Sequence, residues 1–247
     1  MAARGFTLTE RHADEYHTLG YTVFESIVPP PLISGLRQAC EELRCEARRQ
    51  AGPQAQRLTK IIGTGVDAGP FKAYSELPDV RMALEALLGP GTRHGTHMFW
   101  TEEQTDYHAG HGVLIEPAER PYCTNWHRDW RDNVHGLSLD EWDKVCTNRR
   151  LFNQINLALY QDSCLWVVPG SHLRRDTPAE AALFPDRPIP RHPTQASVEE
   201  VPGSVRPAAE VEAEALAYAR SMPGATQLHL NAGDLCVYRS APSEVGI

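Results

Sequence analysis

Short apolar runs separated by glycine and proline follow one another after about residue 92, and they limit the folds open to this chain. Runs of β-branched and aromatic residues are typical of strands, and glycine and proline close strands as turn residues. Many short strands of this kind predict a mainly β protein, a double-stranded β-helix or cupin-like jelly roll with flanking helices. The expected strands are residues 96–100, 112–115, 123–127, 152–160, 165–168, 227–230 and 235–238.

The first ninety residues predict the flanking helices. Thr9 is a candidate N-cap for a helix over residues 8–17, and a strand at residues 21–24 follows Gly20. Prolines at 29–31 stop that strand, and apolar residues then recur at helical spacing from Leu32 to Leu43. A further helix follows Pro78 and closes at Gly89. We therefore expect one domain over residues 1–247, with helices at about 8–90 and jelly-roll strands at about 92–247.

Composition excludes several classes of partner. The chain has 247 residues, 41% hydrophobic content and a formal net charge of −8, with no basic cluster larger than an Arg-Arg pair. A nucleic acid or an anionic membrane surface is therefore not an expected partner. The sequence shows neither a signal-peptide plan nor an apolar run near the roughly 18 residues of a membrane span, so we expect a cytoplasmic protein. The six cysteines form no metal-binding pattern and are expected to be small buried hydrophobic residues.

The segment Asn125–Trp130, with the sequence NWHRDW, carries the chemistry. Residues two apart on a strand point to the same face, so His127 and Asp129 can both reach one metal ion. An imidazole and a carboxylate are two thirds of the 2-His-1-carboxylate set that holds Fe(II) in non-haem oxygenases. An H-x-D tripeptide alone is also compatible with a solvated strand or turn.

Two later segments strengthen the metal-site interpretation. Cys164–His172 has the sequence CLWVVPGSH, and a Gly233-Asp234 turn follows it. The chain opens with a helix, a Gly-Tyr-x-Val strand, prolines and a second helix. This opening, the W-H-x-D segment and the two later segments occur in the order found in the phytanoyl-CoA dioxygenase family. From about Leu8 to about Val237, the chain resembles this family of Fe(II)/2-oxoglutarate-dependent oxygenases.

The resemblance implies an enzyme with Fe(II), 2-oxoglutarate and O2 as cofactor and co-substrates, which hydroxylates a small molecule and releases succinate and CO2. It assigns His127 and Asp129 to the metal, and the presence of Asp129 favours hydroxylation over halogenation. It assigns Thr124 and Asn156 to 2-oxoglutarate, since both side chains can hydrogen-bond a carboxylate or keto oxygen. A strand threonine without a ligand and an asparagine paired with backbone are the alternatives for these two residues.

The chain departs from the family pattern after Asp234. The family carries its second histidine ligand roughly a strand beyond the Gly-Asp turn, and an arginine about one strand later that clamps 2-oxoglutarate. No histidine follows His229 here, and Arg239 comes too early to be that arginine. We expect that the C-terminal strands lie beyond Ile247. The alternative is a cupin-like binding or scaffold protein that lacks the distal iron ligand. His229 is also considered as a substitute ligand.

Two other segments receive roles from the pattern. The Pro-Gly-Ser-His turn at 169–172 is interpreted as a structural corner rather than as a source of a ligand or nucleophile. A long segment at about 173–226, with a helix at about 207–221, is a candidate lid over the barrel mouth. Its helix is expected to turn an apolar side inward. That side consists of Ala208, Val211, Ala215, Leu216 and Tyr218. A passive surface excursion is the alternative for the whole segment.

Overall fold

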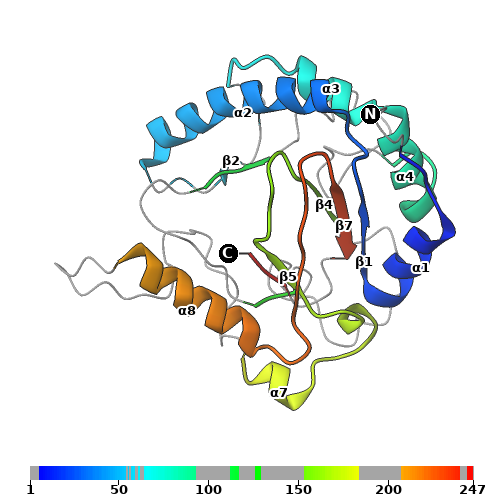
Figure 1. Cartoon of the computed structure of the whole chain (residues 1–247), viewed down its shortest axis with the longest axis vertical. Coiled ribbons are helices and arrows are strands. Elements are labelled where there is room, and N and C mark those ends of the chain that lie inside the picture. Colours follow the sequence, from blue (N-terminus) through cyan, green and yellow to red (C-terminus); the bar gives the residue numbers. More distant parts are fainter. Residues whose placement is uncertain are drawn as a thin grey trace, which may run out of the picture.

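Helices form much of the rim of the molecule and short strands lie at its centre (Figure 1). The structure is a computed structural model. It describes residues 6–53, 55, 57–58, 61, 64–92, 112–116, 126–128, 153–183, 207–239 and 244–246. Within these residues, no helix combines the length and the apolar character needed to span a membrane.

The helices expected in the first ninety residues are present. α1 spans Glu10–Leu19 with Thr9 as its N-cap, and it ends at Gly20, whose φ of 87° lies in the left-handed region that glycine favours. α2 (Pro30–Ala51) starts on prolines, whose missing N–H costs nothing in a first turn. α4 (Pro78–Leu88) ends at Gly89, and a short α3 (Gly69–Ser75), which the sequence pattern did not predict, precedes it.

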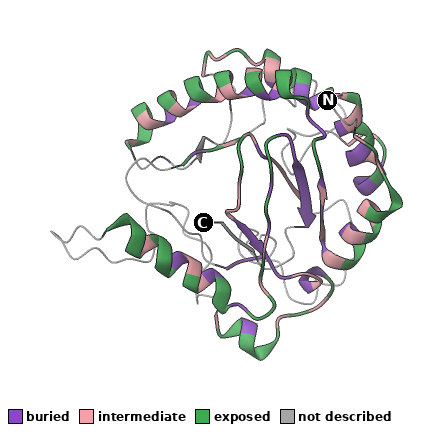
Figure 2. Ribbon diagram, in the orientation of Figure 1, coloured by how far each residue is buried: buried purple, intermediate pink, exposed green. Residues whose placement is uncertain are grey.

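A three-stranded antiparallel sheet has the order β1-β7-β4. β7 (Leu235–Arg239) is the middle strand and is buried throughout, between β1 (Tyr21–Phe24) and β4 (Asn153–Leu157). Leu235 and Val237 turn one face of β7 toward the apolar sides of α1, α2 and α4, where the largest core lies. Figure 2 shows the buried residues of α2 on the side of the helix that faces the sheets.

A second antiparallel sheet has the order β6-β5-β8. β5 (Leu165–Val167) pairs with β6 (Thr226–Gln227) on one side and with β8 (Glu244–Gly246) on the other. Its residues share an apolar core with the face of β7 that points away from the helices. This inter-sheet core consists of Ala158, Leu165, Val167, Leu228, Leu230, Cys236 and Tyr238.

A third core connects the second sheet to the segment that follows it. α8 (Ala208–Ser221) packs its C-terminal half against β5, and α7 (Pro178–Ala181) lies near the end of α8 in Figure 1. The shared core, called the tryptophan core below, consists of Trp126, Trp166, Val168, Ala219 and Met222. The residue flanking His127 on its N-terminal side is therefore packed under α8.

The Gly233-Asp234 turn joins the first sheet to the loop between β1 and α2. The Asp234 carboxylate accepts hydrogen bonds from the backbone N–H groups of Ser26 and Asn231, both at 2.7 Å. A Cβ at Gly233 would lie 2.7 Å from the Val28 carbonyl oxygen, and the φ of Gly233 is 94°. Close backbone approach therefore requires glycine here, and the buried aspartate supplies acceptors for two N–H groups.

The remaining expected strands are shorter than predicted or lie outside the described residues. β3 (Val113–Leu114) pairs with β2 (Arg57–Leu58) in a small separate sheet. The strand expected at 96–100 is outside the described residues, and the one at 123–127 is described only at its last two residues. Among the described cysteines, Cys236 is buried but Cys45 is exposed on α2, so the expectation of buried cysteines is wrong at Cys45.

Candidate functional site

His127 lies in a short described stretch that comprises Trp126, His127 and Arg128. Their exposed fractions are 0%, 8% and 1%, so this part of the W-H-x-D motif is enclosed by protein. The alternative interpretation of the tripeptide, a strand or turn exposed to solvent, does not agree with the burial of these three residues. The His127 imidazole is nearly buried and its two neighbours are packed. Such an imidazole is suited to serve as a metal ligand in a fixed orientation.

The partners expected for His127 cannot be placed beside it. Asp129 and Thr124 lie outside the described residues, so the convergence of His127 and Asp129 on one metal stays a prediction. Within the described part of the chain, no group of three or more His, Cys, Asp or Glu side chains is arranged to hold a metal ion.

Trp126 is held by α8. Its backbone N–H donates a hydrogen bond of 2.9 Å to the hydroxyl oxygen of Tyr218. Its ring belongs to the tryptophan core, where Ala219 and Met222 of the same helical region cover it. The bulk of Trp126 therefore contributes to core packing.

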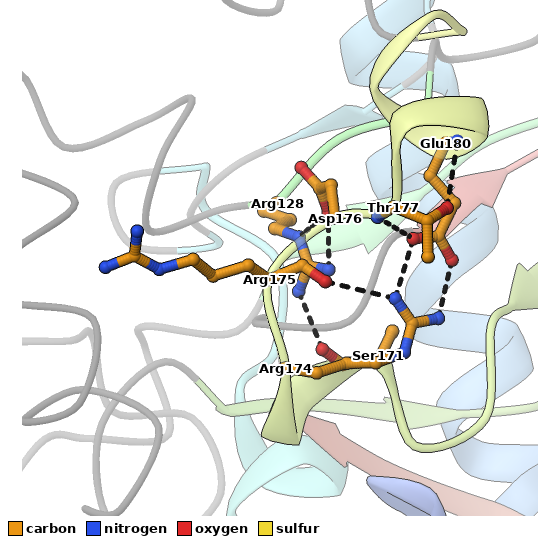
Figure 3. A network of polar contacts seen from close by, with 7 residues as sticks. All are labelled: Arg128, Ser171, Arg174, Arg175, Asp176, Thr177 and Glu180. Atoms are coloured by element: carbon orange, nitrogen blue, oxygen red, sulfur yellow. Dashed lines mark hydrogen bonds and ion pairs between the residues drawn. The ribbon is translucent and has the colours of Figure 1, made fainter.

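Arg128 is an almost fully buried cation with several acceptors (Figure 3). Its Nε donates to Oδ1 of Asp176 at 2.7 Å, and its Nη2 lies 2.6 Å from the same oxygen. Its Nη1 donates to the backbone carbonyl of Ser171 at 3.0 Å. A guanidinium presents its donors in a rigid fork, so these contacts fix the direction of the side chain.

A second ion pair lies next to the first in Figure 3. Arg174 donates from Nη1 and Nη2 to the two carboxylate oxygens of Glu180, each at 2.6 Å. Thr177 caps α7, because its Oγ1 accepts from the Glu180 N–H at 3.2 Å and its own N–H donates to Glu180 Oε2 at 2.7 Å. The hydrogen bonds from Arg174, followed by those from Thr177, lower the pKa of Glu180 to about 2.

Asn156 lies on the face of β4 that points toward the second sheet. Its neighbours Ile155 and Leu157 pack on the helix side, and residues alternate in direction along a strand. The Asn156 Nδ2 donates to the hydroxyl of Tyr238 at 3.2 Å, and that hydroxyl donates to Oε1 of Gln154 at 2.7 Å. The Asn156 side chain therefore bonds to side chains, whereas the alternative considered from the sequence was a bond to backbone. The motifs did not indicate its polar neighbours Gln154 and Tyr238.

His172 packs against the junction of α1 and β1. Its Nε2 lies 3.0 Å from the carbonyl oxygen of His17, which accepts a hydrogen bond when Nε2 carries the proton. A Cβ at Gly20 would lie only 2.5 Å from its Nδ1. Burial is the main cause that lowers the pKa of His172 to about 4. These contacts with backbone agree with a structural corner at residues 169–172.

Two further residues considered from the sequence lie away from the inter-sheet face. His229 is exposed, and its Nδ1 lies 2.8 Å from the Ser163 hydroxyl. Arg239 is buried, and its place on β7 gives it the helix-facing side that Leu235 and Val237 share. Arg239 therefore does not face Asn156. This agrees with the expectation that Arg239 comes too early in the chain to be the arginine that clamps 2-oxoglutarate.

Comparison with solved structures gives partial likeness over nearly the whole chain. AviO1 from Streptomyces viridochromogenes Tue57 matches with a TM-score of 0.53 and 14% identity, over 97% of this chain and 89% of that chain. EvdO2 from Micromonospora carbonacea var. aurantiaca matches with a TM-score of 0.52 and 15% identity, over 99% and 86%. EctD from S. alaskensis, in a structure with 2-oxoglutarate and 5-hydroxyectoine, matches with a TM-score of 0.53 and 15% identity, over 96% and 70%.

No protein-family model and no curated protein matches the sequence. The likeness is therefore one of fold, at a level of identity that carries no residue roles. At the level of fold, the likeness to AviO1, EvdO2 and EctD agrees with the resemblance stated from the sequence.

Proposed function

We propose that the chain forms a single Fe(II)/2-oxoglutarate-dependent oxygenase domain of the jelly-roll type that acts on a small molecule. The observation that carries the proposal is the burial of His127, at 8% exposed, within a W-H-x-D motif on this fold. Two antiparallel sheets that share one inter-sheet core support the proposal of a jelly roll, which is built from two such sheets. The EctD structure, which holds 2-oxoglutarate and a small molecule, supports the same class of co-substrate and substrate.

In this proposal His127 and Asp129 hold Fe(II), and Thr124 and Asn156 contact 2-oxoglutarate. An imidazole and a carboxylate are suitable donors for Fe(II), and His127 is the donor that lies among the described residues. Bound Fe(II) with 2-oxoglutarate and O2 supplies the oxidising chemistry for hydroxylation of the substrate, with release of succinate and CO2.

The residues of the chain provide the surroundings for that chemistry. Trp126 and Trp166 are almost fully buried and keep water from the side of the site that α8 covers. The Asn156 amide offers a donor and an acceptor on the inter-sheet face, and its contact with Tyr238 restricts its orientation. A carboxylate or keto oxygen of 2-oxoglutarate can accept a hydrogen bond from this amide in exchange for the Tyr238 hydroxyl.

Metal and co-substrate binding test the proposal directly. Anaerobic calorimetric titration of the protein is made with Mn(II) as a surrogate, and then with 2-oxoglutarate. We expect His127→Ala and Asp129→Ala each to weaken Mn(II) binding by at least about 100-fold, because a lost ligand affects an open site directly. Asn156→Ala should weaken 2-oxoglutarate binding while Mn(II) binding is retained.

His229→Ala is the matched control, because His229 is exposed and contacts Ser163. It should bind Mn(II) as the unaltered protein does. Equal binding by the His127 and His229 variants would remove the iron site from the proposal. Absence of Mn(II) and 2-oxoglutarate binding in the unaltered protein would favour a cupin-like binding or scaffold protein instead.

A further inference from the structure

We propose that Asp176 and Tyr218 are positioning residues, which hold the backbone on either side of His127 and couple the segment after Ser171 to the candidate metal site. Asp176 holds Arg128, and Tyr218 holds Trp126. The part of the inference that concerns metal binding rests on the proposed function. The mechanical part, the restraint of residues 126–128, does not depend on a metal.

The Arg128–Asp176 pair is the first restraint. Arg128 has an exposed side-chain fraction of 1% and Asp176 one of 19%, so the cation is withdrawn from water while its partner reaches the surface. A buried guanidinium needs acceptors for its donors, and the Asp176 carboxylate and the Ser171 carbonyl accept hydrogen bonds from Nε and Nη1. Because both acceptors belong to the stretch 171–176, this stretch determines where the Arg128 side chain can lie.

The Trp126–Tyr218 contact is the second restraint. The bond uses the backbone N–H of Trp126, so it acts on the main chain one residue before His127. Tyr218 belongs to α8, whose Ala219 packs in the tryptophan core together with the Trp126 ring. A polar contact and an apolar contact from one helix thus hold the same residue.

The two restraints act on the residues directly before and directly after His127 in the sequence. Asp176 precedes α7 and Tyr218 lies in α8, so the described ends of the 173–226 segment both meet this stretch. Displacement of either end changes the position of His127, and a ligand that fixes His127 stabilises both ends.

Amide hydrogen exchange tests the mechanical part without any metal. Asp176→Asn keeps the size of the side chain and removes its charge, and Tyr218→Phe keeps the ring and removes the acceptor. In the metal-free protein, each variant should raise the exchange rate of the amides of residues 126–128 on the order of tenfold, because a lost hydrogen bond of this kind changes local opening by about that factor.

Glu180→Gln and Tyr160→Phe are the matched controls. The first removes an ion pair of the same segment that does not contact Arg128, and the second removes an exposed phenol hydroxyl. Both should leave exchange at residues 126–128 unchanged, although Glu180→Gln should raise exchange in α7. Unchanged exchange at residues 126–128 in the Asp176 and Tyr218 variants would overturn the inference.

Calorimetric titration with Mn(II) then tests the coupling to the site. Substitution of a residue that orients a metal ligand typically weakens metal binding by about 10- to 100-fold. Both positioning variants should therefore bind Mn(II) that much more weakly, with an unaltered far-ultraviolet circular dichroism spectrum. Equal Mn(II) affinity in these variants, in a protein that binds Mn(II), would reject the coupling. If the unaltered protein does not bind Mn(II), the proposed function fails, and the exchange experiment alone decides whether residues 126–128 are held.

Discussion

Two arginine–carboxylate pairs at the start of the 173–226 segment differ in which partner is buried. In the first pair the arginine, Arg128, is 1% exposed, whereas in the second the carboxylate of Glu180 is 1% exposed and Arg174 is 40% exposed. A buried charge keeps its ionised form only when hydrogen bonds and an opposite charge replace its hydration. In each pair, the stability of the segment therefore depends on one buried ionised residue, Arg128 in the first and Glu180 in the second.

Glu180 should make stability depend on pH in acid. Its folded-state pKa of about 2 lies below the ordinary glutamate pKa of 4.5, so the stabilisation is fully present above about pH 5 and is lost as the pH falls toward 2. We expect Glu180→Gln to lower the free energy of unfolding at pH 7 by about 2 kcal/mol, after allowance for solvent screening at Arg174. Urea unfolding of both proteins between pH 7 and pH 2 should show the difference shrinking with acidification.

The control for this measurement is Glu41→Gln, since Glu41 pairs with Arg44 on the exposed side of α2. An exposed pair of this kind contributes little, so the control should stay close to the unaltered protein at every pH. A constant difference between the Glu180 variant and the unaltered protein from pH 7 to pH 2 would contradict the assignment.

Gly20 should not tolerate a side chain. Its φ of 87° is unfavourable for other residues, and a Cβ would lie 2.5 Å from the ring of buried His172. We expect Gly20→Ala to lower the free energy of unfolding by about 2–4 kcal/mol, from backbone strain and overpacking together. Gly65→Ala is the control, because Gly65 has a similar φ of 80° with nothing within 4 Å of the added carbon. Similar thermal midpoints for the two variants would show that the His172 contact has no effect.

At the scale of the elements, α8 illustrates how far an apolar pattern predicts a packed face. The pattern indicates Ala208, Val211, Ala215, Leu216 and Tyr218 as the apolar side. In the structure Ala215 and Ala219 are buried, Leu216 and Tyr218 pack nearby, and Ala208 is exposed. The C-terminal half of the helix meets the sheet, so the contact continues to Ala219 and Met222 and does not include the first turn.

Met222 should contribute much of the attachment of α8. Its exposed fraction is 1% in the tryptophan core, so Met222→Ala leaves a cavity beside Trp126 and Trp166. We expect a loss of about 2–5 kcal/mol in the free energy of unfolding, or local release of α8 with faster amide exchange in residues 208–221. Met82→Ala is the control, because Met82 is 45% exposed on α4. Equal effects of the two substitutions in urea unfolding would contradict the packing described for α8.

At the scale of the whole molecule, the first sheet, the helices and the Gly-Asp turn form one connected body. β7 pairs with β1 from the beginning of the chain and with β4 from its middle. Asp234 adds a connection from the start of β7 to Ser26, in the loop that leads into α2. Segments far apart in sequence therefore meet at one buried strand and one buried carboxylate.

Loss of the Asp234 carboxylate should weaken this connection. Asp234→Ala removes the buried carboxylate that accepts hydrogen bonds from the N–H groups of Ser26 and Asn231, and a hydrogen bond to a charged group contributes about 1.5–3 kcal/mol. We expect a loss of at least about 2 kcal/mol, measured as a lower urea midpoint. Asp67→Ala is the control, since Asp67 accepts one N–H bond from Gly69 on the surface. A midpoint no lower than that of the control would show that the turn is held by backbone contacts alone.

The features that the sequence predicted are those governed by neighbouring residues. Thr9 caps α1 and Gly89 closes α4 as expected, because capping acts within a turn of the chain. The strands at β1, β4, β5 and β7 were likewise indicated by their own apolar and β-branched residues. His127 was singled out from its motif by the same local reasoning, and its pairing with Asp129 remains a prediction.

The contacts around His127 were decided by tertiary structure. Arg128 pairs with a carboxylate 48 residues away, Trp126 with a hydroxyl 92 residues away, and Asn156 with a hydroxyl 82 residues away. No spacing rule connects residues so distant, because the choice among many acceptors depends on which segments the apolar cores bring together. The sequence by itself determined the helix ends, the strands and the residue types of the candidate site, whereas packing of α8 and of the stretch after Ser171 decided which partners hold them.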